Sequence, residues 1–325
     1  MSNNQTQYKI QENDQGMRLD RWLCQHFEDL PYTVWAKLCR KGSVRLNGKR
    51  VKGHENIRTG DCVRVPPPNV LDGLKQKGRV KKTVVFSDKD AHRFESMIVY
   101  QNDNLICINK PSGLASQGGS KIKESVDQMA KSWGSKQNLK PKLLHRLDRD
   151  TSGLLLLAKN DATARKIGQK FKNGLVKKFY IAILQGVPHP LQSRIIAPIE
   201  KGTAKDKEMM VISESGKKTV TDYEIIEHLG KKVSIVLLSP ETGRTHQLRL
   251  HMAYLKTPIV GDFKYGQGSY LECDDLCLHA YTIKIPELSQ NVHCSLPSHM
   301  ANLLEGLGIK EGEILKLVHN KISSL

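Results

Sequence analysis

One short stretch of the chain concentrates residues that could do chemistry. Residues 145–153 read His-Arg-Leu-Asp-Arg-Asp-Thr-Ser-Gly, so two carboxylates and two guanidinium groups share a tight turn that ends in Gly153. The apolar run from Leu154 to Ala158 follows at once and is typical of a buried strand. A carboxylate held by such a strand at the rim of a core can act as a nucleophile or as a base. The alternative is a surface turn whose aspartate caps the next element and pairs with a neighbouring arginine.

Residues 145–153 resemble the signature of the RluA-type family of pseudouridine synthases. Four further segments match motifs of that family, in the family's order, across residues 96–290. They read Asn-Lys-Pro-Ser-Gly at 109–113, Lys-Phe-Tyr-Ile-Ala at 178–182, Thr-Gly-Arg-Thr-His-Gln-Leu-Arg-Leu-His at 242–251 and Leu-His-Ala at 278–280. One departure lies at residues 116–119, which read Ser-Gln-Gly-Gly where many members have a Val-His pair before the glycines.

The resemblance implies an activity and assigns roles to five residues. Members of the family break the C1′–N1 bond of a uridine already in RNA, turn the base and join C5 to C1′, without a metal or other cofactor. Asp148 would be the catalytic carboxylate, either as nucleophile at C1′ or as base for the ribose 2′ proton, and Arg249 would keep it ionised. Tyr180 would lie against the base, with Leu278 on its other side. A stacked uracil must be flipped out to react, and Arg146 would enter the vacated stack.

The residues that precede these motifs predict a small basic unit over 16–68. Apolar residues from Leu19 to Phe27 follow a helical spacing, a second helix is expected over 33–40, and Asn47-Gly48 is a strong hairpin signal. This order resembles the RNA-binding domain typified by ribosomal protein S-four, and residues 15–68 hold 11 Lys and Arg against 5 Asp and Glu, a net charge of +6. The residues expected to contact RNA are Arg18, Lys37, Arg40, Lys41, Arg45 and Lys49. The alternative is a solvated basic face.

The chain is therefore expected to divide into four parts. These are a polar tail over 1–15, the S-four-like unit over 16–68, a basic linker with few apolar residues over 69–94, and a catalytic domain over 95–325. In the last part, candidate strands at 105–108, 154–158, 178–184, 219–226 and 233–238 outnumber candidate helices at 125–133, 162–172 and 297–307. The predicted fold class is α+β, with a mostly antiparallel mixed sheet preceded by the helix–helix–hairpin unit. The fold of the family that the motifs resemble, a mixed sheet flanked by helices, agrees with this prediction.

The amino-acid composition limits the kind of binding partner and the cell compartment to be expected. The 325 residues contain 51 Lys and Arg against 33 Asp and Glu, and the formal net charge of +18 favours a polyanionic partner. No apolar run approaches the ~18 residues of a spanning helix. The N-terminus lacks secretory and organellar features, and seven scattered cysteines fit a reducing compartment, so a cytoplasmic protein is expected. Cys273 and Cys277, with His279 nearby, lack a second cysteine pair at zinc-finger spacing, and no metal site is predicted.

Within the family, the chain is most similar to the members that act on bacterial large-subunit (23S) rRNA. The expected partner is that RNA or a pre-ribosomal particle, with no membrane and no obligate protein partner. Alternative targets are a tRNA or the sites of a second rRNA-modifying subgroup with the same domain order. A different class of protein, a non-catalytic RNA-binding ribosome-assembly factor, is disfavoured because Asp148, Tyr180 and Arg249 are all present.

Overall fold

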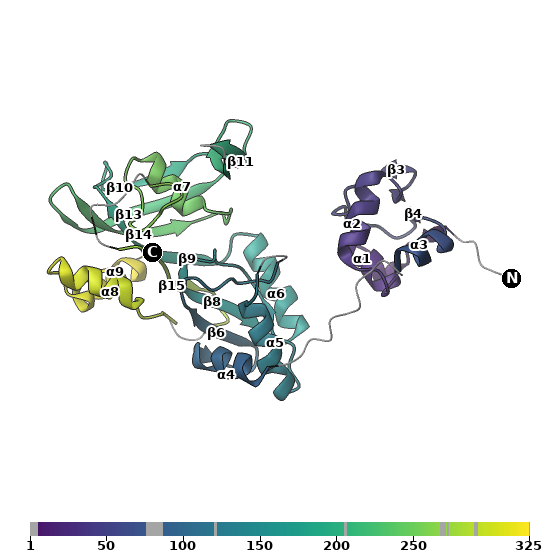
Figure 1. The fold of residues 1–325 in the computed structure, drawn as a ribbon, viewed down its shortest axis with the longest axis horizontal. Coiled ribbons are helices and arrows are strands. Elements are labelled where there is room, and N and C mark those ends of the chain that lie inside the picture. Colours follow the sequence, from purple (N-terminus) through teal and green to yellow (C-terminus); the bar gives the residue numbers. More distant parts are fainter. Residues whose placement is uncertain are drawn as a thin grey trace. The chain divides into compact units, whose positions relative to one another are not determined.

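The chain forms two compact units, Met1–Val85 and Phe86–Leu325, in a computed structural model (Figure 1). The structure describes residues 6–75, 87–119, 122–204, 207–266, 271, 273–288 and 292–324. Within these ranges, no helix combines the length and the apolar character needed to cross a bilayer.

The first unit has the predicted order of two helices followed by a hairpin. Helix α1 (Leu19–His26) and helix α2 (Tyr32–Lys41) precede strands β2 (Arg45–Leu46) and β3 (Lys49–Arg50). The hairpin prediction is confirmed: Asn47 and Gly48 both have positive φ, 48° and 76°, as a two-residue turn of the type favoured in hairpins requires. Strands β4 (Cys62–Arg64) and β1 (Gln7–Lys9) complete a sheet of order β1-β4-β2-β3.

The structure differs from the predicted tail and linker. In the tail, β1 pairs with β4 and Ile10 is buried. Within 69–94, helix α3 (Pro68–Lys75) packs Leu71 on the core of the first unit, and helix α4 (Asp88–Ser96) buries Ala91 and Phe94 in the second. A few apolar side chains at regular spacing are enough to anchor a segment to a core that other elements build. Residues 1–5 and 76–86 of these stretches lie outside the described residues.

The second unit is built on one large sheet. Its strands lie in the order β10 (Gln192–Ile196), β13 (Val220–Leu229), β14 (Val233–Pro240), β9 (Lys177–Gln185), β15 (Leu278–Lys284), β8 (Ser152–Ala158), β6 (Leu105–Lys110) and β5 (Ile98–Gln101), and β7 (Lys142–Leu143) also pairs with β8. Among the described neighbours, β15 and β8 are parallel and the others antiparallel. The predicted α+β class with a mostly antiparallel mixed sheet is confirmed.

Two apolar layers cover the two faces of this sheet. Along β8, Leu155 and Leu157 join the core shared with α4 and α5 (Val126–Lys136), and Leu154 and Leu156 join the core shared with α6 (Asp161–Lys172). This burial on both faces explains the unbroken apolar run and confirms the predicted buried strand. Helices α7 (Gln247–Tyr254), α8 (Ser298–Gly306) and α9 (Glu311–Ser323) pack on the first of these cores. A separate hairpin is formed by β11 (Ile199–Ala204) and β12 (Lys207–Ile212).

Candidate active site

A cleft of about 600 Å³ in the second unit gathers the residues that were expected to act on the base. Arg146, Asp148, Tyr180, Arg249 and Leu278 all line it. They come from segments as far apart in sequence as residues 146 and 278, so only the folded chain brings them together.

The three central strands set the spacing of three of these side chains. Asp148 lies in the loop that enters β8, Tyr180 lies on β9, and Leu278 begins β15. Across the sheet, Ala280 of β15 is opposite Tyr180 on one side and Gly153 on the other. Gly153 has φ of 106°, and a Cβ there would lie 2.2 Å from the carbonyl oxygen of Ala280. The last residue of the charged motif must therefore be glycine for β8 and β15 to approach.

A buried lysine holds the loop that carries Asp148. The Lys110 side chain is fully buried, and its Nζ donates hydrogen bonds to the carbonyl oxygens of Pro111, Leu114 and Arg149 at 2.9, 2.8 and 3.0 Å. Burial lowers its pKa to about 7, although the charges of Asp150 and Asp148 act to raise it. The Asn-Lys-Pro-Ser-Gly motif thus ties its own turn to the loop that carries Asp148.

Ser116 and Arg149 add to this connection. The hydroxyl of Ser116 donates to the carbonyl of Leu147 at 2.7 Å and accepts from its amide at 3.1 Å, and Nε of Arg149 donates to the carbonyl of Gly113 at 3.0 Å. The sequence departure at residues 116–119 therefore begins in direct contact with Leu147, the residue before Asp148. The contact depends on tertiary folding, since the bonded residues are 31 positions apart.

Replacing Lys110 with Met is expected to lower the free energy of unfolding by about 3 kcal/mol, because one buried and two part-buried carbonyl acceptors lose their donor. Urea denaturation at pH 6.0 measures the change, because below a pKa of about 7 the Lys110 side chain is mostly the charged form that carries three hydrogens. The exposed Lys140→Met in the same unit is the matched control, with an expected change of less than about 0.5 kcal/mol. Equal stability of the two variants would show that the Lys110 bonds do not support the fold.

Arg249 is bound directly by a residue that sequence reasoning missed. Its Nε and Nη2 donate to the two carboxylate oxygens of Asp262 at 2.8 and 2.7 Å, and both side chains are buried. Burial acts to lower the pKa of Arg249, but the hydrogen bonds and charge of Asp262 and the charge of Asp148 raise it overall. Arg249 therefore remains a cation beside Asp148 while its hydrogen bonds go to Asp262. Asp262 lies outside all five motifs and outside every candidate strand and helix, so no sequence signal pointed to it.

Tyr180 and Leu278, the two residues expected to lie against the base, offer an apolar and neutral surface. Tyr180 is 9% exposed and Leu278 is 3% exposed, whereas Arg146 is exposed beside them. Burial and the charge of Asp148 raise the pKa of Tyr180 above its ordinary value, so its hydroxyl stays protonated. Tyr180 can thus present a ring face and a neutral hydroxyl, and the arrangement disfavours a phenolate base.

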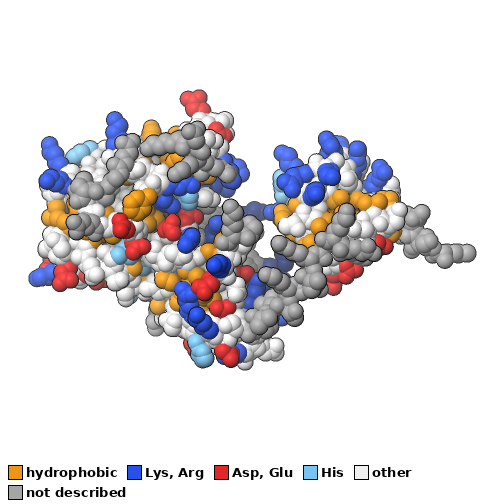
Figure 2. Space-filling view, in the orientation of Figure 1, with side chains coloured by type: hydrophobic (Ala, Val, Ile, Leu, Met, Phe, Trp, Pro, Cys, Tyr) orange, Lys and Arg blue, Asp and Glu red, His pale blue; other side chains and the backbone are white. Residues whose placement is uncertain are grey.

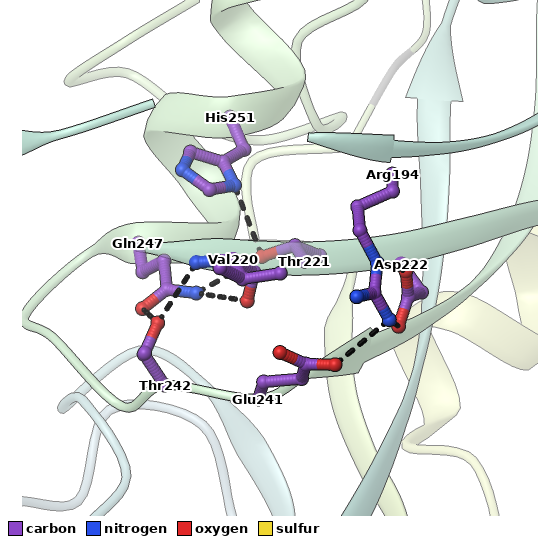
Figure 3. A network of polar contacts seen from close by, with 8 residues as sticks. All are labelled: Arg194, Val220, Thr221, Asp222, Glu241, Thr242, Gln247 and His251. Carbon is purple, nitrogen blue, oxygen red and sulfur yellow. Dashed lines mark hydrogen bonds and ion pairs between the residues drawn. The ribbon is translucent and has the colours of Figure 1, made fainter. Parts of the chain in front are cut away.

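A polar network fixes the segment that precedes α7 (Figure 3). Nε2 of Gln247 donates to the carbonyl of Val220 and to Oγ1 of Thr221, both at 3.0 Å, and Oε1 of Gln247 accepts from Oγ1 of Thr242 at 2.7 Å. His251 contacts the same Thr221 hydroxyl at 3.0 Å through Nδ1. The buried Gln and the second His of the 242–251 motif therefore serve to attach α7 to β13.

Two buried histidines, His251 and His279, predict acid sensitivity of the fold. Burial lowers the pKa of each to about 4, although a backbone hydrogen bond acts to raise it. The pKa of a histidine in the unfolded chain is about 6.5, so between about pH 4 and 6.5 the unfolded chain binds more protons than the folded chain. The contribution to stability is therefore complete above pH 6.5 and is lost as the pH falls from 6.5 to 4. At pH 5 the burial of each histidine should lower the free energy of unfolding by about 2 kcal/mol.

Urea unfolding at pH 7.5 and pH 5.0 measures this loss. His279→Gln should reduce the difference between the two pH values, and the exposed His92→Gln of the same unit should leave it unchanged. A stability that does not change between pH 7.5 and 5.0 would contradict the prediction.

The cysteines weighed as zinc ligands lie side by side, with Sγ of Cys273 and Sγ of Cys277 3.5 Å apart. His279 is turned to other partners: its Nδ1 lies 2.9 Å from Oγ of Ser152. In the described part of the chain, no three His, Cys, Asp or Glu side chains are arranged to hold a metal.

The basic residues expected to contact RNA lie on two elements of the first unit. Lys37, Arg40 and Lys41 are on α2, and Arg45 and Lys49 are on the β2–β3 hairpin; all five are exposed. Figure 2 shows Lys and Arg side chains gathered on this side of the unit. The sixth residue, Arg18, is also exposed, but it lies at the start of α1, away from these two elements, and forms an ion pair with Asp20 at 2.5 Å. We call the five residues on α2 and the hairpin the basic face.

Comparison with known proteins gives concordant matches. The family model described as RNA pseudouridylate synthase matches residues 104–254, which include Asp148, Tyr180 and Arg249. The protein named ribosomal large subunit pseudouridine synthase C of Vibrio parahaemolyticus is 33% identical over 91% of this chain and 93% of its own length. Its namesake from Haemophilus influenzae is 33% identical over 92% and 94%.

Two solved human structures also match. Human RNA Pseudouridylate Synthase Domain Containing 4 has a TM-score of 0.56 and 28% identity, and the match covers 68% of this chain and 97% of that one. Human RNA Pseudouridylate Synthase Domain Containing 1 has a TM-score of 0.53 and 30% identity, over 63% and 85%.

Proposed function

The chain belongs to the RluA family of RNA pseudouridine synthases, and from this premise we propose that it isomerises specific uridines of large-subunit (23S) rRNA. The observation that carries the proposal is the convergence of Asp148, Tyr180 and Leu278 in one cleft, from three adjacent central strands or their ends. The target is supported by relatives that are named for the ribosomal large subunit and match over more than nine-tenths of the chain. Such a substrate implies action in the cytoplasm.

Asp148 supplies the reacting carboxylate in this proposal. It attacks C1′ of the target uridine or removes the ribose 2′ proton, and in either route the C1′–N1 bond breaks. The freed uracil turns within the cleft and C5 bonds to C1′, while the Asp148–C1′ bond breaks or, in the other route, the proton returns to C2′. The hydrogen on C5 then leaves as a proton, and N1 takes up a proton. The backbone N–H of His246 donates to Oδ2 of Asp148 at 3.2 Å, and the Arg249 cation lies nearby. The carboxylate thus has one backbone hydrogen-bond donor and a positive charge near it.

Base flipping accounts for the remaining cleft residues. A uracil in a helix or a stacked loop has no reachable C1′, so it must leave the stack to enter the cleft. Tyr180 and Leu278 then pack against its faces and exclude water, and the exposed Arg146 replaces it in the stack, where a planar guanidinium can stack and hydrogen-bond at once. The basic face of the first unit binds the phosphates of the same RNA.

Tritium release from RNA labelled at C5 of uridine tests the function. We expect release from a 23S rRNA transcript or a precursor particle, and none from a tRNA transcript. Release from tRNA alone would overturn the rRNA target, and binding without release from any of these RNAs would favour the non-catalytic assembly factor. Mapping pseudouridines in rRNA from cells that lack the protein separates the synthase C sites from those of the related synthase D subgroup.

A further inference from the structure

Tyr265 lies where three segments around the cleft meet. Its Oη accepts a hydrogen bond from the backbone N–H of Met210 on β12 at 3.2 Å, and it lies 2.8 Å from Nδ1 of His246. The guanidinium carbon of Arg249 is 5.3 Å from the centre of the Tyr265 ring. The mechanism proposed above uses neither the Tyr265 hydroxyl nor the imidazole of His246.

His246 connects this hydroxyl to Asp148. Its backbone N–H is the donor to Oδ2 of Asp148, and this geometry requires an unusual backbone, with φ of 55° at His246. A residue with a Cβ adopts the left-handed region at a cost of about 1–2 kcal/mol, so the conformation persists only where other contacts enforce it. The hydrogen bond between the imidazole and Tyr265 is such a contact.

Tyr265 is itself held by the aspartate that binds Arg249. Oδ1 of Asp262 accepts from the backbone N–H groups of Lys264 and Tyr265, both at 3.0 Å. One buried carboxylate thus orients both the Arg249 cation and the turn that carries the Tyr265 ring. The Arg249 cation and the turn that carries Tyr265, the hydrogen-bond partner of His246, are therefore both held by Asp262.

The hydrogen-bond inventory favours one direction for the bond between Tyr265 and His246. A phenol has one hydrogen to donate, and because Oη accepts the Met210 N–H, donation of the hydroxyl hydrogen to Nδ1 uses both the acceptor and the donor capacity of the hydroxyl. Nδ1 is then the acceptor, and the neutral imidazole carries its hydrogen on Nε2.

We propose that Tyr265 and His246 are a positioning pair that aims the His246 backbone N–H at Asp148 and so orients the reacting carboxylate. The pair also couples the β11–β12 hairpin to that carboxylate through Met210. This inference rests on the proposed role of Asp148.

Tyr265→Phe keeps the ring and removes the hydroxyl. We expect kcat for tritium release to fall about tenfold, the kinetic equivalent of one lost neutral hydrogen bond, with KM changed less than about twofold. The ¹⁵N chemical shifts of the His246 imidazole, measured on the full-length protein, should show the Nε2–H tautomer in the wild type and a tautomer mixture in the variant. Tyr254→Phe is the matched control, because Tyr254 is 58% exposed and lies outside these contacts.

A second pair of variants tests the positioning role if Tyr265→Phe does not fold. His246→Asn keeps an acceptor near the Nδ1 position and tolerates positive φ, whereas His246→Ala does neither. The Asn variant should retain several-fold more kcat than the Ala variant. Equal kcat of Asn and Ala, or a Tyr265→Phe enzyme with wild-type kcat and an unchanged tautomer, would overturn the positioning role. A wild type that releases no tritium would instead overturn the proposed function, and the ¹⁵N shifts would still test the pair.

Discussion

Asp148→Asn is expected to slow pseudouridine formation by at least about 10³-fold, while the dissociation constant for RNA changes by less than about threefold. The amide has the size and shape of the carboxylate and can still accept the His246 N–H. It has no negative charge with which to attack C1′ or take a proton. The loss should therefore appear in kcat and not in binding, and tritium release together with filter binding measures the two quantities.

Asp150→Asn is the control for that variant. Asp150 lies two residues further on, its side chain is exposed, and its backbone carbonyl accepts from Oγ of Ser112 at 2.9 Å. It is expected to keep the rate within a few-fold of the wild type. An Asp148→Asn enzyme that retained more than about 1% of the rate would remove Asp148 from the reaction, since a lost nucleophile or base leaves far less.

Neutralising the basic face is expected to weaken RNA binding about 10²-fold or more at 0.15 M salt. The variant replaces Lys37, Arg40, Lys41, Arg45 and Lys49 with Gln, all of them exposed, so the fold of the first unit should persist. Each phosphate contact contributes about 0.7–0.9 to the slope of log K against log salt concentration. The slope should therefore flatten by about 4, as measured by titrations at several salt concentrations.

A variant with Lys231→Gln and Lys316→Gln tests whether the effect is specific to that face. Both lysines are exposed on the second unit, away from the residues that line the cleft. Their replacement lowers the net charge but should leave the salt slope nearly unchanged. If the five-site variant kept the wild-type slope, the first unit would not contact phosphates, and the RNA-binding role proposed for it would fail.

The local sequence pattern was sufficient to predict those helices, strands and turns whose formation depends on residues close together in sequence. The apolar run at 154–157, the Asn47-Gly48 hairpin and the helix at 161–172 were all predictable, because periodicity and turn residues act over a few positions. Helix α7 was not predicted within the 242–251 motif. Its buried Gln247, Arg249 and His251 are polar, and they are tolerated only because distant partners satisfy their hydrogen bonds.

The sequence by itself determined the family, the α+β class, and the set of Asp148, Tyr180, Arg249, Leu278 and Arg146 that the cleft brings together. The family and this set of residues follow from the resemblance of the motifs to those of known members, and the α+β class follows from local periodicity. Only the tertiary structure decided what supports the set: Lys110 under the catalytic loop, Asp262 as the partner of Arg249, and Tyr265 behind His246. Residue types at these positions were visible in the sequence, but the partners of a buried donor or acceptor depend on which strands and loops meet in space. A hydrogen bond over 39 residues leaves no periodic trace along the chain.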